Sequence, residues 1–155
     1  MSQQPLTIKA ALQIGKTPET VFEAIVDPAQ MSHYFISEST GRMEAGKQLN
    51  WRFPEFDMDF PVRVGDVIKP SYISYYWGEA GKELLVEINI TPYADGHSVV
   101  TVTEKSMDND EAGINWLKGN TEGWANFLAC LKAWLEYGVH LRRGAFDFRA
   151  NEKHK

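Results

Sequence analysis

Glu104 is the residue whose type and position most suggest chemistry. It ends residues 100–104 (VTVTE), in which apolar and polar side chains alternate. Because successive side chains of a β-strand point to opposite faces, Glu104 shares the face of Val100 and Val102. A carboxyl group on an inward face suits proton transfer or a hydrogen bond to a ligand. Alternatively, the strand ends before Glu104, or Lys105 and solvent satisfy its carboxylate.

The histidines give no metal-binding pattern. His33, His97, His140 and His154 are scattered, and none has a partner at the short spacing that zinc sites use. The motifs of serine hydrolases, zinc proteases and phosphate-binding loops do not occur in the sequence either. We therefore expect no metal, no cofactor and no catalytic triad.

Large aromatic residues are the second candidate for function. Six of them share the inward parity of the predicted strands and helix: Trp51, Phe53, Tyr75, Trp77, Trp124 and Phe127. Each ring buries on the order of 150–250 Å², so together they can fill a solid core. They can equally line a gap that holds an apolar or aromatic ligand. The sequence leaves both interpretations open.

A long amphipathic helix is predicted for residues 121–139. At about 100° per residue, its apolar side chains fall within an arc of roughly 140°. These residues are Trp124, Phe127, Leu128, Leu131, Trp134, Leu135 and Val139. Asn120 or Thr121 caps its start, and Gly138 or Gly144 provides its end. The polar residues 105–120 are expected to form a loop, with Trp116 as a lid or a surface residue.

Period-two alternation predicts strands around this helix, the first over residues 7–14 and the others from residue 37 onward. Between them, Thr17-Pro18 and Asp27-Pro28 start two short helices. Gly46, Ala80-Gly81 and Asp95-Gly96 mark turns, and Gly65 marks a bulge. The prediction is an α+β architecture, in which a curved antiparallel sheet of about seven strands covers the helix. The space between sheet and helix is the candidate site.

The composition limits the class of protein. The chain has 155 residues, 43% of them hydrophobic, which suits one domain large enough for a core with a cavity. Its net charge of −5 argues against a nucleic-acid or anionic-membrane surface. Cys130 is the one cysteine, so no internal disulfide forms, and the N-terminus has no export pattern. We therefore expect a cytoplasmic protein without a membrane segment.

Several of these pieces resemble the activator-of-HSP-90-ATPase homologue family. They are the TPETVFEAI opening at residues 17–25, the Asp27-Pro28 step, the turn at Gly46, the VTVTE strand, and Gly123-Trp124 followed by spaced leucines. The resemblance implies the helix-grip fold of the START, birch-pollen-allergen and SRPBCC superfamily. It implies one domain over residues 1–155, with a core over 7–139 and an extension over 140–155. One departure is His33-Tyr34-Phe35, where the family usually carries a tryptophan.

The resemblance also implies a ligand entrance near His33 and Phe35. His33 is either a ligand contact or an ordinary half-exposed helix residue. With the inward residues above, the predicted ligand-binding set is Trp51, Phe53, Tyr75, Trp77, Glu104, Trp124, Phe127, Leu128, Leu131, His33 and Phe35.

Three functions fit the resemblance. We expect a binding module for a hydrophobic or aromatic small molecule, held between sheet and helix. The family name implies instead a co-chaperone that docks on HSP-90 and stimulates its ATPase, although one domain offers no second part to bridge a large chaperone. A polyketide cyclase-like enzyme is the third possibility, and the lack of an acid–base constellation weakens it.

The C-terminal tail, residues 140–155, is basic on an acidic protein. It carries Arg142, Arg143, Arg149, Lys153 and Lys155, with Phe146 and Phe148 as apolar anchors. We expect the tail to dock on its own sheet or on a second subunit of a homodimer. The alternative is a solvated end beyond Arg149.

Overall fold

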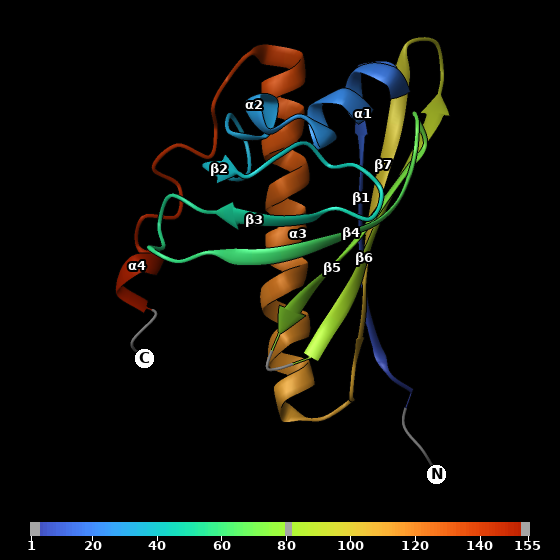
Figure 1. Ribbon diagram of the computed structural model, residues 1–155. Helices are drawn as coiled ribbons and strands as arrows, with labels where there is room; N and C mark the ends of the chain where they lie inside the picture. Colours follow the sequence, from blue (N-terminus) through green and yellow to red (C-terminus); the bar gives the residue numbers. More distant parts are fainter. Residues whose placement is uncertain (1–3, 80–81, 153–155) are drawn as a thin grey trace.

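The computed structural model describes residues 4–79 and 82–152 and combines one sheet with a long helix (Figure 1). Seven antiparallel strands follow the order β1-β7-β6-β5-β4-β3-β2 across the sheet. They are β1 (Leu6–Ile14), β2 (Glu38–Ser39), β3 (Gln48–Arg52), β4 (Phe60–Ile68), β5 (Tyr72–Glu79), β6 (Lys82–Tyr93) and β7 (His97–Met107). The predicted α+β helix-grip architecture is confirmed.

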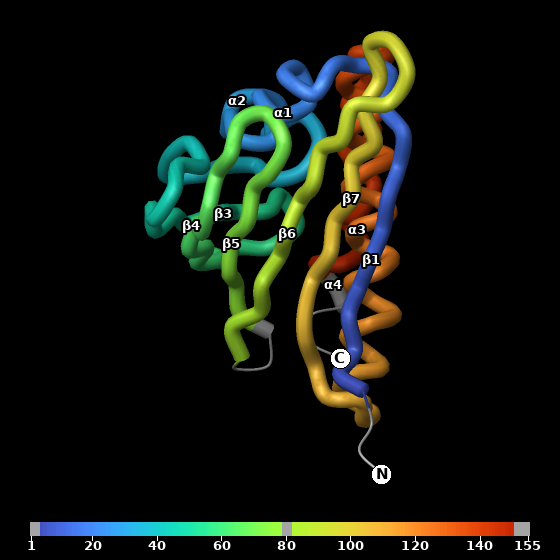
Figure 2. Tube along the Cα trace, turned by 90° about the vertical axis from the view of Figure 1, so that its right-hand side faces the viewer, coloured from blue at the N-terminus to red at the C-terminus, as the bar shows by residue number. Residues whose placement is uncertain are grey.

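The sheet curls around the long helix α3 (Glu111–Tyr137). Strands β1 and β7 run alongside α3, whereas β3 and β4 turn away from that direction (Figures 1 and 2). A bulge bends β4, where its pairing with β5 shifts between Val64 and Val67. A Cβ on Gly65 would lie only 2.6 Å from the Ser74 Oγ, so any larger residue at the bulge would force the Ser74 side chain to shift.

Two short helices, α1 (Pro18–Val26) and α2 (Pro28–Met31), follow β1. The side chains of Thr17 and Asp27 cap them as predicted, each accepting a hydrogen bond from a first-turn N–H. Helix α2 ends at Met31, so Tyr34 lies in the turn after it. The Tyr34 hydroxyl donates to the Ala24 carbonyl at 2.9 Å, which ties that turn to α1.

Helix α3 begins at Glu111, not at residue 121, and the predicted loop before it is wrong. Asp110 is the N-cap, and its side chain accepts a hydrogen bond from the Gly113 N–H at 2.8 Å. A Cβ on Gly113 would lie 1.8 Å from the Asp108 carbonyl oxygen, so only glycine lets this turn approach the preceding chain. Trp116 is consequently a buried helix residue and neither a lid nor a surface residue.

Gly138 ends α3 in the left-handed conformation, with φ at 65°, as predicted. Because the helix stops there, Val139 leaves the apolar arc and is exposed. The tail then turns back past the loop between β3 and β4 and ends in α4 (Arg149–Glu152) (Figure 1). Phe146 is half-buried, whereas Phe148 is exposed and does not anchor the tail. Lys153 and Lys155 lie outside the described residues.

Within residues 4–79 and 82–152, no helix is both long and apolar enough to cross a bilayer. The turn predicted at Ala80-Gly81 lies outside the described residues.

Candidate functional site

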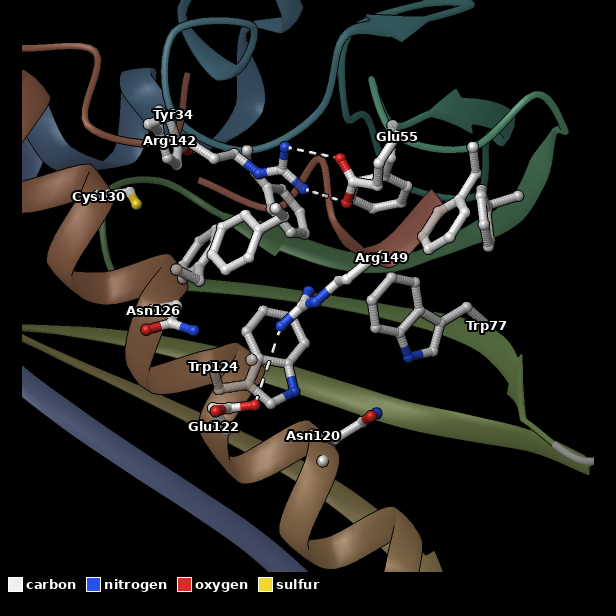
Figure 3. Close-up of a pocket in the computed structure, with 18 of the residues that line it drawn as sticks. Tyr34, Glu55, Trp77, Asn120, Glu122, Trp124, Asn126, Cys130, Arg142 and Arg149 are labelled. Atoms are coloured by element: carbon white, nitrogen blue, oxygen red, sulfur yellow. Dashed lines mark hydrogen bonds and ion pairs between the residues drawn. The ribbon is translucent and has the colours of Figure 1, made fainter. Parts of the chain in front are cut away.

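A cleft of about 540 Å³ lies between α3 and the part of the sheet that curls away from it (Figure 3). Helix α3 supplies one wall, from Gly119 to Cys130. Strands β4 and β5, together with the loop between β3 and β4, supply the opposite wall. The tail contributes Arg142, Phe146 and Arg149, and the turn after α2 contributes Tyr34 and Phe35, so four separate segments of the chain enclose one space.

Aromatic side chains dominate the lining of this cleft. The Phe127 ring centroid lies 4.7 Å from that of Phe35 and 5.2 Å from that of Trp124, and both contacts are nearly perpendicular. Trp77 approaches Trp124 from the sheet at 5.7 Å. Edge-to-face contacts such as the two that Phe127 makes are favourable, and they restrain the rings. The nine aromatic lining residues are Tyr34, Phe35, Phe53, Phe56, Phe60, Trp77, Trp124, Phe127 and Phe146.

Glu104 lies fully buried behind this lining, on the inward face of β7. Its Oε1 accepts hydrogen bonds from the Trp124 Nε1 at 2.7 Å and the Asn120 Nδ2 at 3.1 Å. Its Oε2 accepts one from the Trp77 Nε1 at 2.8 Å. One carboxyl group therefore fixes two indole rings and an amide that face the cleft. Lys105 does not satisfy it, because the Lys105 ammonium pairs with Glu87.

Trp51 and Tyr75 form a second aromatic layer behind Trp77. The Tyr75 ring centroid lies 5.1 Å from that of Trp51 and 5.4 Å from that of Trp77. Burial, and then the nearby Glu104 carboxylate, raise the pKa of the Tyr75 hydroxyl well above its usual value. Among the described residues, neither this hydroxyl nor the Trp51 indole N–H has a hydrogen-bond partner.

A buried ion pair holds the tail over the cleft. The Arg142 guanidinium donates to both carboxylate oxygens of Glu55, at 3.1 and 2.8 Å. The two side chains are only 9% and 2% exposed. Arg142 also lies 5.7 Å from the Phe53 ring centroid and 5.0 Å from that of Phe146. Two parallel hydrogen bonds make this pair directional, and they dock the tail on the loop between β3 and β4 of its own chain, where a strand of the sheet or a second subunit was predicted.

Two glycines widen the cleft on the α3 wall. Gly119 and Gly123 both line it, and a Cβ built on either one would meet no atom within 4 Å. Glycine in a helix interior costs roughly 0.5–1 kcal/mol relative to alanine. The helix is thus locally less stable at the positions where the cleft needs room.

The nucleophilic and metal-binding chemistry of the cleft is limited. Burial raises the pKa of the Cys130 thiol, so this lining residue stays protonated and weakly nucleophilic at neutral pH. Within the part of the chain that the structure describes, no group of three or more His, Cys, Asp or Glu side chains can hold a metal ion.

Five residues of the predicted ligand-binding set line the cleft: Phe35, Phe53, Trp77, Trp124 and Phe127. Trp51, Tyr75 and Glu104 lie behind the lining, and Leu128 and Leu131 are buried in the core. His33 lies elsewhere and stacks on Trp134, with ring centroids 4.1 Å apart. Its Nδ1 is 3.0 Å from the Ala29 carbonyl oxygen.

Sequence reasoning missed the charged and small residues of the cleft. Glu55 and Arg142 are 87 positions apart, and no local pattern joins them. Gly119 and Asn120 fell in the segment interpreted as a loop. The one available signal was the basic tail on an acidic chain, which predicted docking but not the partner.

Comparison with known proteins identifies a family and several similar structures. The family described as Activator of Hsp90 ATPase homolog 1-like protein matches residues 16–136. A crystallised protein of Staphylococcus saprophyticus is 34% identical, with a TM-score of 0.77 over 86% of this chain and 94% of that one. Comparison with curated proteins gives no match.

Two more distant structures share the fold. An Aha1 dimer from Colwellia psychrerythraea is 16% identical, with a TM-score of 0.73 over 86% of this chain and 98% of that one. An HSP90 activator from Plasmodium falciparum is 15% identical, with a TM-score of 0.67 over 84% of this chain and 96% of that one. Because the family match spans most of the 155 residues, the chain belongs to the Activator of Hsp90 ATPase homolog 1-like family.

Proposed function

We propose that the protein binds a hydrophobic, aromatic small molecule in the cleft between α3 and the sheet. The observation that carries this proposal is the aromatic lining of a space of about 540 Å³. Ligand sites are typically clefts of about 300–1,000 Å³, lined by apolar and aromatic side chains with a few polar groups. The amides of Asn120 and Asn126 supply such polar groups here.

Preorganisation supports the same proposal. Trp77 and Trp124 are held by Glu104, and Trp124 is in contact with Phe127. Side chains that are already fixed lose little conformational entropy when a ligand binds. A flat molecule can therefore be accepted without rebuilding the wall.

A matched pair of variants tests the proposal with N-phenylnaphthylamine, a neutral aromatic probe that fluoresces in apolar sites. Gly123→Phe places a ring in the open space of the cleft, where an added Cβ meets no atom within 4 Å. Ala125→Phe places the same ring on the exposed side of α3. The wild type and Ala125→Phe are expected to bind the probe saturably, whereas Gly123→Phe is expected to lose binding and stay folded. Absence of saturable binding, or equal binding by all three proteins, would refute the proposal.

Stimulation of a chaperone ATPase is the second candidate, and the family match together with the Plasmodium HSP90 activator favours it. That activator is 15% identical to this chain, which supports a common fold rather than a common partner. An HSP-90 ATPase assay separates the two functions. Stimulation that survives Gly123→Phe would indicate surface docking that does not use the cleft. Turnover of a bound molecule would indicate the cyclase-like alternative instead.

A further inference from the structure

The cleft contains two ion pairs of very different quality. Arg142 and Glu55 satisfy each other with two hydrogen bonds in a buried position. Arg149 and Glu122 approach only to 3.9 Å, which is beyond hydrogen-bond distance. The first pair fixes the tail to the loop between β3 and β4. The second pair leaves the N–H donors of Arg149 and the carboxylate oxygens of Glu122 available to a ligand.

Arg149 is placed to meet a ligand. Figure 3 shows its side chain reaching from α4 into the cleft, toward Glu122 and Trp124. Its guanidinium lies 4.2 Å from the Phe146 ring centroid, a cation–π contact that restrains it. Among the described residues, no hydrogen bond to this guanidinium is found. Its planar donors match the oxygens of a carboxylate or sulfonate.

The difference in exposure between the two partners favours an anionic ligand over a cationic one. The Arg149 side chain is 29% exposed, whereas that of Glu122 is 70% exposed. The Glu122 carboxylate therefore remains hydrated, while the guanidinium is partly shielded from water. Charge interactions are stronger where water is partly excluded, so an anion gains more at Arg149 than a cation gains at Glu122.

We propose that the ligand of the cleft is an aromatic acid, whose rings lie against Trp77 and Trp124 and whose anionic group binds Arg149. This inference rests on the proposed function and adds the charge of the ligand to it. Binding displaces Glu122 from its loose contact with Arg149. The tail thereby contributes to recognition of the ligand as well as to the wall of the cleft.

Two probes with one ring system test the inference. Anilinonaphthalene sulfonate has the skeleton of N-phenylnaphthylamine with an added anionic group. On the wild type we expect the sulfonate to bind about fivefold to tenfold more tightly than the neutral probe, as a partly exposed ion pair allows. Added salt is expected to reduce this preference, because screening weakens a partly exposed pair.

Single substitutions locate the effect. Arg149→Gln is expected to weaken sulfonate binding more than binding of the neutral probe, and so to remove the preference for the sulfonate. Arg143→Gln, on the same tail but exposed and outside the lining, is the matched control and is expected to change neither affinity. Glu122→Gln is expected to strengthen sulfonate binding, because it removes the competing carboxylate.

The outcomes separate this inference from the proposed function. Equal affinities for the two probes, with Gly123→Phe still blocking both, would overturn the anionic ligand and leave the cleft as the binding site. Equal weakening of both probes by Arg149→Gln would show that Arg149 acts only by packing the tail, and this also overturns the inference. Failure of the wild type to bind either probe would overturn both proposals.

Discussion

The two sides of α3 meet the sheet in different ways. On one side the helix packs directly along β1 and β7, and side chains such as Leu128 and Leu131 are fully enclosed in the core. On the other side Gly119, Gly123, Trp124 and Phe127 face a cleft that the tail and the curled strands complete. We refer to these as the packed side and the cleft side. One helix thus separates the region that stabilises the fold from the region that leaves space.

Glu104 connects the two sides. It lies in β7, a strand that packs against α3. Its carboxyl group nevertheless accepts hydrogen bonds from Trp77 and Trp124 on the cleft side. The rings of the cleft are therefore held by the packed region. This explains how an open space can have a well-ordered wall.

The largest effect is expected on the packed side. Leu131 is 0% exposed, so Leu131→Ala should lower the free energy of unfolding by about 2–5 kcal/mol, since it leaves a cavity. Lys118→Ala, an exposed position on the same helix, should cost less than about 0.5 kcal/mol. Denaturant unfolding measures both values. Equal losses of unfolding free energy in the two variants would mean that Leu131 is not enclosed between α3 and the sheet.

A smaller effect is expected where the two sides meet. Glu104→Gln replaces one acceptor oxygen by an NH₂ group that then faces an N–H donor, which should cost about 1–3 kcal/mol. It should also weaken binding of N-phenylnaphthylamine, because an indole loses its anchor. Glu83→Gln is the control, since Glu83 pairs with Arg63 on the solvent side of the sheet. A Glu104→Gln protein as stable as Glu83→Gln would contradict the linking role.

On the cleft side, filling space in the helix should raise the free energy of unfolding, in contrast to the two losses above. Gly123→Ala should raise the free energy of unfolding by about 0.5–1 kcal/mol, because alanine favours the helix and its Cβ enters open space. The same change on the packed side, Gly113→Ala, should destabilise, because its Cβ would lie 1.8 Å from the Asp108 carbonyl oxygen. Opposite signs in thermal melts are the expected result. Destabilisation by both would show that the cleft is filled.

The smallest expected effect is a pH dependence near the end of α3. Hydrogen bonds from the Lys132 ammonium and the Gly15 backbone N–H lower the pKa of Glu136. A lowered folded-state pKa stabilises the protein above the unfolded value of about 4.3, and that contribution is lost as the pH falls through the folded value. Glu136→Gln should therefore lower stability at about pH 7 but much less at about pH 3. An equal loss at both values would exclude a role for the charge.

The sheet was predictable from the sequence because period-two patterns carry local information. The row through Val100 and Val102 correctly placed Glu104 inside, and Gly46, Gly65 and Gly138 marked a turn, a bulge and a helix end. The first turns of α3 were not predictable in this way. Their glycines and asparagines disfavour a helix, and the Asp110 cap together with burial of Trp116 in the core stabilises the helix there nevertheless.

The cleft was predictable only in part. Inward parity identified the rings of Trp77, Trp124 and Phe127, yet the same rule included Trp51 and Tyr75, which lie one layer deeper. The alternation of side chains shows which face of the sheet a residue lies on, but not how far that residue lies from the cleft. The pairing of Arg142 with Glu55 depends on the path of the whole chain, so no local pattern reveals it.

The tryptophan indole N–H signals in a nuclear magnetic resonance titration with N-phenylnaphthylamine test the central claim most directly. Trp77 and Trp124 line the cleft, whereas Trp116 is buried in the core and Trp134 stacks on His33. We expect the Trp77 and Trp124 signals to shift saturably and the Trp116 and Trp134 signals to stay in place. Shifts of Trp116 or Trp134 without those of the cleft pair, or no shifts at all, would contradict the account.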